Sequence, residues 1–209
     1  MPGIYDQALP QTPANHVALT PLSFIARTAA VYPERTAIIH GALKRNWRDT
    51  YARCRQLASI LAKSGVTTGG TVAVMLPNIP AMVEAHFGIP MTGAVINALN
   101  TRLDAEAIAF MLDHSDTSVV LVDKELSGVM QDALKIANVK PLVVDVDDAE
   151  YTGAGTRIGS IEYDALLRKA MRRLRGNTRP TNGRPSRSAT PAAPPATRKA
   201  WSPIIVARI

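Results

Sequence analysis

The chain has 209 residues, of which 46% are hydrophobic, and this suits one globular domain with an extension. Its net charge of +7 is unevenly spread, because residues 1–167 carry 13 Lys and Arg against all 17 Asp and Glu, whereas residues 168–209 carry 11 Lys and Arg and no acid. The basic average therefore does not identify a nucleic-acid-binding protein, the single cysteine excludes a disulfide framework, and no apolar run approaches the roughly 20 residues of a membrane span.

The N-terminal arm, residues 1–20, lacks the charged and then apolar layout of a signal peptide, so we expect a cytoplasmic chain. A helix is predicted over 21–31, where apolar residues recur at helical spacing after Thr20, a good N-cap. The β-branched run at 36–41 predicts a strand. Residues 46–65 predict a helix of about five turns, with Asn46 as its cap and Gly65 as its stop.

Apolar strands then alternate with helices. Strands are expected at 71–78, 93–99, 118–123 and 141–146, and helices at 79–91, 104–115 and 124–138. Continuous runs of Val, Ile and Leu are typical of parallel strands buried on both faces, so the predicted fold is a layered α/β sheet. Ligands of such sheets bind at the carboxyl ends of strands, which places them at the loops that begin at Pro77 and Asn97. The pattern does not specify the order of the strands.

The body offers few residues for chemistry. Its histidines are scattered without metal-ligand spacing, at His16, His40, His86 and His114. Cys54 lies within a helical pattern and is expected to be a half-buried structural side chain. The acids Asp145, Asp147, Asp148 and Glu150 lack the Gly and final Glu of a calcium loop and are expected in a solvated loop. We therefore assign no catalytic, cofactor-binding or metal-binding residue.

Residues 15–167 nevertheless resemble the first third of an acyl-CoA synthetase of the adenylate-forming (AMP-binding) superfamily, in its short- and medium-chain branch. The resemblance rests on ALTPLSFIARTAAVYPERTAIIHG and WRDTYARCRQLAS, and above all on PNIPAMVEAHFG followed by LNTRL. It implies a scaffold segment of an enzyme that uses MgATP to convert a carboxylic acid to an acyl adenylate and then to an acyl-CoA.

The same resemblance implies that the catalytic parts are absent from residues 1–209. Family members carry a phosphate loop of the type YTSGTTGxPKG, a nucleotide and acyl pocket and a catalytic lysine further along the chain. We therefore expect no ATP, magnesium or coenzyme A to be bound by this chain and no activity of the chain alone. The acyl substrate of the full-length family member is not specified by residues 1–209.

The basic tail encodes the missing loop in another reading frame. When the degenerate codons of TPAAPPATRKAW, residues 190–201, are regrouped one base earlier, they permit YTSGTTGNPKGV, and the flanking codons permit DEWASIALG before it and VSHHRGAY after it. The tail itself has Pro191, Pro194 and Pro195, which lack the N–H groups that a phosphate loop needs. We infer a frameshift near Leu167 and Arg168, by gene lesion or sequencing error.

Three domains are thus expected: the arm at 1–20, a partial AMP-binding N-terminal domain at 21–167 and a disordered, out-of-frame basic tail at 168–209. Exposed apolar edges predict aggregation or residual homo-oligomer contacts. One alternative is an α/β binding module whose cationic tail grips nucleic acid or anionic membrane. Another is a regulatory partner that keeps the family's dimer contacts. The preferred interpretation predicts no specific nucleic-acid partner.

Overall fold

The computed structural model describes residues 20–176, which lie within one compact unit, Met1–Asn177. Predictions for residues 1–19 and 177–209, including most of the basic tail, fall outside the described residues. The helices are α1 (Pro21–Val31), α2 (Trp47–Lys63), α3 (Pro80–Gly88), α4 (Ala105–His114), α5 (Ser127–Ile136) and α6 (Tyr163–Gly176). The strands are β1 (Thr36–His40), β2 (Leu43–Asn46), β3 (Thr71–Met75), β4 (Val95–Ala98), β5 (Thr117–Asp123), β6 (Leu142–Val146) and β7 (Ile161–Glu162).

The main sheet has five strands in the order β4-β3-β5-β6-β7, and every neighbouring pair is parallel. β3 is placed between β4 and β5, so the chain passes from β3 to β4 on one side and then crosses to β5 on the other. The layered parallel sheet expected from the sequence is confirmed.

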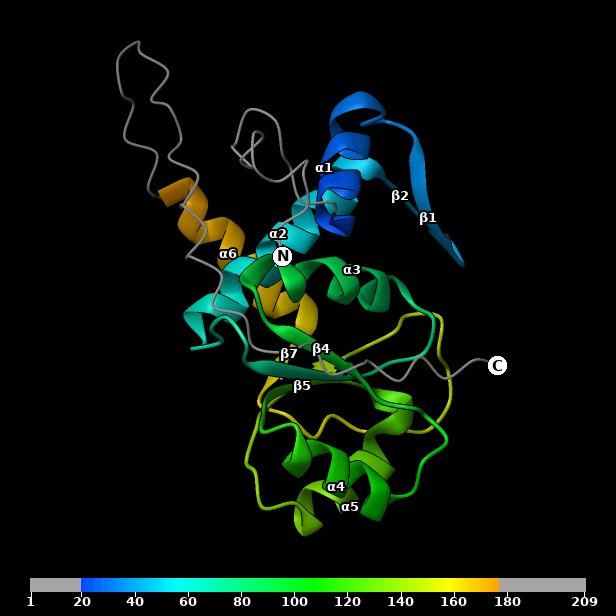
Figure 1. The fold of residues 1–209 in the computed structure, drawn as a ribbon. Coiled ribbons are helices and arrows are strands. Elements are labelled where there is room, and N and C mark those ends of the chain that lie inside the picture. Colours follow the sequence, from blue (N-terminus) through cyan, green and yellow to red (C-terminus); the bar gives the residue numbers. More distant parts are fainter. Residues whose placement is uncertain (1–19, 177–209) are drawn as a thin grey trace, which may run out of the picture. The chain divides into compact units, whose positions relative to one another are not determined.

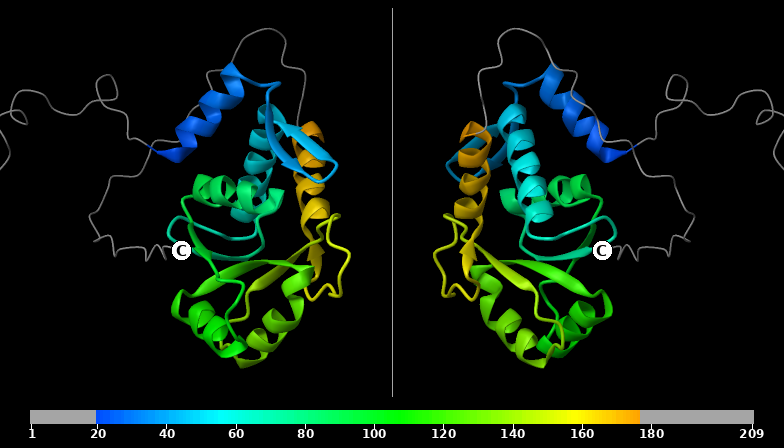
Figure 2. Two further views of the ribbon diagram at one scale, coloured as in Figure 1. Left: turned by 90° about the vertical axis from the view of Figure 1, so that its right-hand side faces the viewer. Right: turned by 90° about the vertical axis from the view of Figure 1, so that its left-hand side faces the viewer.

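Helices cover both faces of this sheet, with α4 and α5 on one face and α2, α3 and α6 on the other (Figures 1 and 2). Successive side chains of a strand point to opposite faces, so Val72 and Val74 of β3 join the core beneath α2 and α3. Ala73 and Met75 join the second core, against α4 and α5. The resulting three layers explain why the strands are apolar throughout.

The β1–β2 hairpin and α1 lie outside these three layers. The strands of the hairpin pair in antiparallel fashion, and α1 packs on α2 through the buried Ile25 and Ala29. The side chain of Thr20 accepts a hydrogen bond from the Leu22 N–H, as expected of the N-cap. Asn46 likewise caps α2, accepting a hydrogen bond from the Asp49 N–H at 2.8 Å. Both caps were predicted from the sequence.

Three elements were not predicted: β2, β7 and α6. β2 reads LKRN, which has no apolar alternation, and β7 comprises two residues only. Helix α6 continues past Leu167 to Gly176, so the domain boundary placed there falls inside a helix. Within residues 20–176, no helix combines the length and the apolar character needed to cross a membrane.

Candidate functional site

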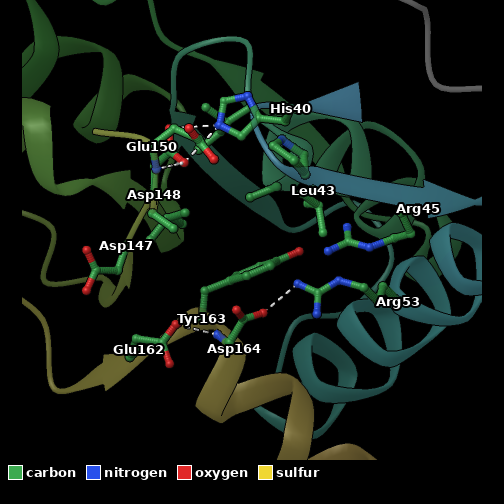
Figure 3. Close-up of a pocket in the computed structure, with 15 residues that line it drawn as sticks. His40, Leu43, Arg45, Arg53, Asp147, Asp148, Glu150, Glu162, Tyr163 and Asp164 are labelled. Atoms are coloured by element: carbon green, nitrogen blue, oxygen red, sulfur yellow. Dashed lines mark hydrogen bonds and ion pairs between the residues drawn. The ribbon is translucent and has the colours of Figure 1, made fainter. Parts of the chain in front are cut away.

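One cavity, which we call the hairpin cavity, lies between the β1–β2 hairpin, α2, the first residues of α3, the segment after β6 and the start of α6 (Figure 3). Its volume is about 240 Å³. Elements far apart in the sequence therefore meet around one space. The polar side chains that line it are His40, Arg45, Arg53, Asp147, Asp148, Glu150, Glu162, Tyr163 and Asp164.

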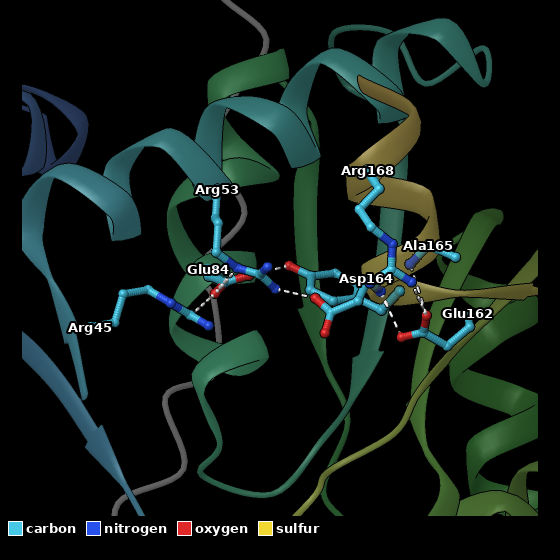
Figure 4. Close-up of polar contacts among 8 residues, drawn as sticks. Arg45, Arg53, Glu84, Glu162, Asp164, Ala165 and Arg168 are labelled. Atoms are coloured by element: carbon cyan, nitrogen blue, oxygen red, sulfur yellow. Dashed lines mark hydrogen bonds and ion pairs between the residues drawn. The ribbon is translucent and has the colours of Figure 1, made fainter. Parts of the chain in front are cut away.

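A buried carboxylate, Glu84 of α3, organises one wall of the hairpin cavity (Figure 4). Its Oε1 accepts hydrogen bonds from Arg45 of the hairpin and from Nε of Arg53 in α2, the latter at 2.7 Å. Its Oε2 accepts a hydrogen bond from the Tyr163 hydroxyl at 2.8 Å, and Arg53 also pairs with Asp164 at 2.6 Å. We call these five side chains the Glu84 network, and they join the hairpin to α2, α3 and α6.

The environment of the Glu84 network shifts the pKa of two of its members. Burial by itself would lower the pKa of Arg53, but its hydrogen bonds and charge pairing with Glu84, and then with Asp164, raise that pKa above its ordinary value. Burial, followed by the Glu84 charge, raises the pKa of Tyr163 well above its usual range. Arg53 is therefore fixed as a cation and Tyr163 as a neutral donor, and neither is suited to transfer a proton near neutral pH.

The tip of the hairpin is fastened to the segment that follows β6. His40 Nε2 lies 2.8 Å from Asp148 Oδ1, and the Ala42 N–H donates to Glu150 Oε1 at 3.1 Å. Gly41 between them has φ +53°, and a Cβ there would lie 1.9 Å from the Glu150 carboxyl carbon. Glycine suits this position because its backbone adopts the left-handed conformation without steric cost, whereas the Glu150 carboxylate, at the end of a flexible side chain, would have to move aside for a Cβ.

The remaining acids around the hairpin cavity also have partners. Asp147 pairs with Lys124 at 2.8 Å and with Arg157 at 3.0 Å. The Glu162 carboxylate accepts the N–H groups of Asp164 and Ala165, at 2.7 and 2.8 Å, and so caps the first turn of α6 (Figure 4). The cavity thus contains many charges, and the groups described here are engaged in holding elements together.

These residues do not fit the MgATP that the family resemblance implies. A triphosphate needs free cationic side chains or a row of backbone N–H groups, whereas the two arginines of the cavity are bound to Glu84 and Asp164. Carboxylates outnumber the cations of the lining. Among residues 20–176, no group of three or more His, Cys, Asp or Glu is arranged to hold a metal ion.

The two loops expected to bind ligands begin on neighbouring strands, since Val74 of β3 is in register with Ala98 of β4. After the Pro77 loop, Ile79 and Pro80 line the hairpin cavity and a second groove between β1 and α3. Asn97 instead donates its side-chain amide to Ser115 at 3.1 Å. The first of the two predicted loops therefore leads into a cavity.

The other residues considered in the sequence have structural partners. His86 contacts the Met82 carbonyl within its own helix, and His114 stacks on Phe110, whereas His16 lies outside the described residues. Cys54 was expected to be a half-buried structural side chain, but it is fully buried. Burial raises the pKa of its thiol to about 12.

Within the acidic segment, Asp147 and Glu150 are exposed in the loop after β6, as expected, but Asp145 is not. Asp145 is buried and accepts hydrogen bonds from the Ile158 and Gly159 N–H groups, at 2.9 and 3.1 Å to Oδ1. Spacing along the chain gives no sign of these contacts, because the partners lie in a loop without regular structure. The Glu84 network could not be predicted from spacing either, because its members come from four separate elements.

The sequence matches the family model described as AMP-binding enzyme over residues 25–195, which is most of the chain. This chain belongs to the AMP-binding enzyme family. Its α/β fold agrees with that assignment, because it is also found in solved adenylate-forming CoA ligases. With the anthranilate CoA ligase AuaEII in complex with anthranoyl-AMP, the TM-score is 0.64 at 20% identity, covering 71% of this chain and 27% of that one.

Similar AMP-binding enzymes include plant CoA ligases. The chain is 46% identical over 170 residues to the peroxisomal acetate/butyrate–CoA ligase AAE7 of Arabidopsis thaliana, covering 76% of this chain and 30% of that protein. The same identity and coverage are found for acetate–CoA ligase CCL3 of Humulus lupulus. A putative long-chain-fatty-acid CoA ligase of Rhodopseudomonas palustris has a TM-score of 0.58 at 29% identity, covering 71% of this chain and 36% of that one. The chain spans about 30% of the length of its curated relatives.

Proposed function

We propose that this chain is the N-terminal scaffold segment of an acyl-CoA ligase for short- or medium-chain carboxylic acids, and that the 209-residue chain alone does not form acyl adenylate. The relatives named acetate/butyrate–CoA ligase and acetate–CoA ligase support the substrate class. The Glu84 network and the fastened hairpin support the scaffold role, because their charged groups hold elements together. A place in fatty acid metabolism is part of the same proposal.

The observation that carries the proposal is the reading frame of the phosphate loop. Residues 1–209 contain no YTSGTTGxPKG sequence, yet the codons of residues 190–201 permit it after a one-base shift. The position of the frameshift near Leu167 stays a prediction. Both the family match, which extends to residue 195, and helix α6, which continues to Gly176, run past that point.

Carboxylate-dependent exchange of pyrophosphate into ATP tests the lack of adenylation. We expect purified 209-residue chain to give no exchange above an enzyme-free blank with acetate or butyrate, while the Arabidopsis acetate/butyrate–CoA ligase in the same assay exchanges rapidly. Exchange that increases with both the chain and the carboxylate would refute the proposal.

A control must separate an inactive folded chain from an unfolded one. Cys54 serves here because burial raises the pKa of its thiol to about 12 and removes it from solvent. A folded chain is expected to react with a thiol reagent only after urea is added. Inactivity counts for the proposal only in a preparation that shows this protection.

A cytoplasmic location is a further part of this proposal. Five of the similar plant enzymes are named peroxisomal, which makes the peroxisome the competing location. Fluorescence microscopy of the chain fused to a fluorescent protein distinguishes a diffuse signal from a punctate one that coincides with a peroxisomal marker.

A further inference from the structure

The β1–β2 hairpin is fixed to the rest of the fold at its base. Arg45 of β2 pairs with the buried carboxylate of Glu84 in α3 (Figure 4). At the point where β2 leads into α2, the Trp47 N–H donates to the Arg35 carbonyl at 3.0 Å. The base is therefore joined to both helices, and it cannot move without breaking contacts of the Glu84 network.

The outer part of the hairpin, residues 39–44, has little packing around it. Along β2, burial decreases from the half-buried Arg45 to the exposed Leu43, and Ile39 of β1 is 67% exposed. On one side lies the hairpin cavity, and on the other lies the groove between β1 and α3, with a volume of about 560 Å³. His40 lines both spaces. The outer part is thus flanked by open space rather than by a packed core.

An irregularity in the ladder separates the base from the outer part. The register of β1 on β2 shifts between Thr36 and Ile38, so Ala37 lies at a bulge. A bulge interrupts the ladder and bends the strand that contains it. The hairpin therefore has a natural hinge just beyond its fixed base.

The tip of the hairpin is held by two polar contacts with the segment after β6 (Figure 3). His40 Nε2 lies 2.8 and 3.0 Å from the two carboxylate oxygens of Asp148, and the Ala42 N–H donates to Glu150 at 3.1 Å. We call these contacts the latch. Among residues 20–176, no further side-chain hydrogen bond or ion pair joins residues 39–44 to another element. Release of the latch would leave the outer part held only at the hinge.

We propose that residues 39–44 form a hinged flap, closed by the latch, which opens to give solvent access to the hairpin cavity. The hairpin cavity and the groove already share Ile79 and Pro80 as lining residues, so an open flap joins them into one cleft. Opening exposes Ala81, which lines the cavity and is buried in the closed form. This inference concerns the described body and does not depend on the ligase activity proposed above.

Hydrogen exchange of the full 209-residue chain, measured by NMR and corrected for intrinsic rates, tests the flap. The Ala42 N–H has its acceptor across the latch, so it exchanges whenever the flap opens. The Val120 N–H lies in the central strand β5, and its exchange requires disruption of the sheet. We expect exchange at Ala42 to be nearly independent of low urea concentrations, because a local opening exposes little surface, and exchange at Val120 to accelerate with urea.

A matched pair of histidine variants assigns the opening to the latch. His40→Ala removes the contact with Asp148 and is expected to accelerate exchange at Ala42 at least about threefold, without changing Val120. His86→Ala makes the same chemical change in α3, where the imidazole contacts only a carbonyl of its own helix. This variant is expected to leave exchange at Ala42 unchanged.

Thiol labelling gives a second measurement, on the cavity instead of the hairpin. Ala81→Cys places a thiol in the lining of the hairpin cavity, and the natural Cys54, fully buried, serves as a reference for global unfolding in the same molecule. We expect the thiol introduced at residue 81 to react faster than Cys54, and His40→Ala to accelerate its reaction alone. Peptide mass spectrometry distinguishes the two sites.

Three results would each overturn the proposal. The first is exchange at Ala42 that follows Val120 in its dependence on urea. The second is exchange at Ala42 that His40→Ala leaves unchanged. The third is a thiol at residue 81 that reacts no faster than Cys54, because the cavity would then open only when the whole domain unfolds.

Discussion

Tyr163 and Glu84 form a buried pair in which the hydroxyl is the only described partner of Glu84 Oε2. Tyr163→Phe keeps the ring but leaves this carboxylate oxygen unpaired, so we expect the free energy of unfolding to fall by about 1–3 kcal/mol. Urea denaturation followed by circular dichroism measures the change.

Tyr151→Phe provides the matched control for this variant. Its hydroxyl donates to the Ala154 carbonyl at 2.9 Å at the protein surface. Loss of that bond is expected to change the free energy of unfolding by no more than about 0.5 kcal/mol. Equal effects of the two substitutions would show that the buried hydroxyl contributes nothing particular to the Glu84 network.

Asp123, at the end of β5, is a buried carboxyl that should make stability depend on pH. Burial raises its pKa, and Oδ2 has no hydrogen-bond partner among the described residues. The pKa of Asp123 in the folded state lies above its unfolded value of about 3.9. The protonated carboxyl therefore stabilises the folded state below pH 3.9, and this contribution is lost as the pH rises through the folded-state pKa. We therefore expect Asp123→Asn to gain stability relative to wild type between pH 4 and pH 7, measured by urea denaturation.

Asp113→Asn is a control of opposite sign. Hydrogen bonds from the Val139 and Asn138 N–H groups lower the pKa of Asp113, so its contribution is present above the unfolded pKa and is lost as the pH falls. This variant should lose stability relative to wild type at pH 7 and recover toward it in acid. If both variants followed the same trend with pH, the assignment of the two shifts to burial and to hydrogen bonding would be wrong.

At the scale of elements, Gly88 sets how closely α3 approaches α2. A Cβ at this position would lie 2.8 Å from Leu57 Cδ2 and 2.9 Å from the Cys54 carbonyl oxygen. Gly88→Ala should force the two helices apart and lower the free energy of unfolding by about 1–3 kcal/mol. Thermal denaturation measures the loss.

Gly128→Ala in α5 makes the same chemical change where there is space. No atom lies within 4 Å of a Cβ built there. We expect this variant to be more stable than wild type by about 0.4–1 kcal/mol, because alanine restricts the unfolded chain. If Gly128→Ala were less stable than wild type, helix propensity and steric fit would not explain the difference between the Gly88→Ala and Gly128→Ala variants.

The elements that could be predicted are those with a local signal. Caps such as Thr20 and Asn46 fix where α1 and α2 begin, and apolar runs mark the strands of the main sheet. β2 and β7 carry no such signal, since each is defined by its partner strand. The order of the strands also depends on long-range packing, which no local pattern reports.

At the scale of the whole molecule, the family was evident from motifs, whereas the site was not. The Glu84 network depends on distances between α2, α3, α6 and the hairpin, so Arg53 and Tyr163 could not be selected from spacing in the sequence. The family resemblance also explains why the body shows so little chemistry. We propose that the part of an acyl-CoA ligase that holds phosphates is encoded in the tail in another reading frame.

Nucleotide sequence across codons 160–209 is the most direct test of this account. For many of these residues, the amino acid specifies the first two bases of the codon and leaves the third base free. In the shifted frame, each of these third bases becomes the first base of a codon. We expect the bases found there to spell YTSGTTGNPKG in the shifted frame from codons 189–200. Third bases that spell another sequence in that frame would contradict it, and residues 168–209 would then have to be explained as a tail in their own right.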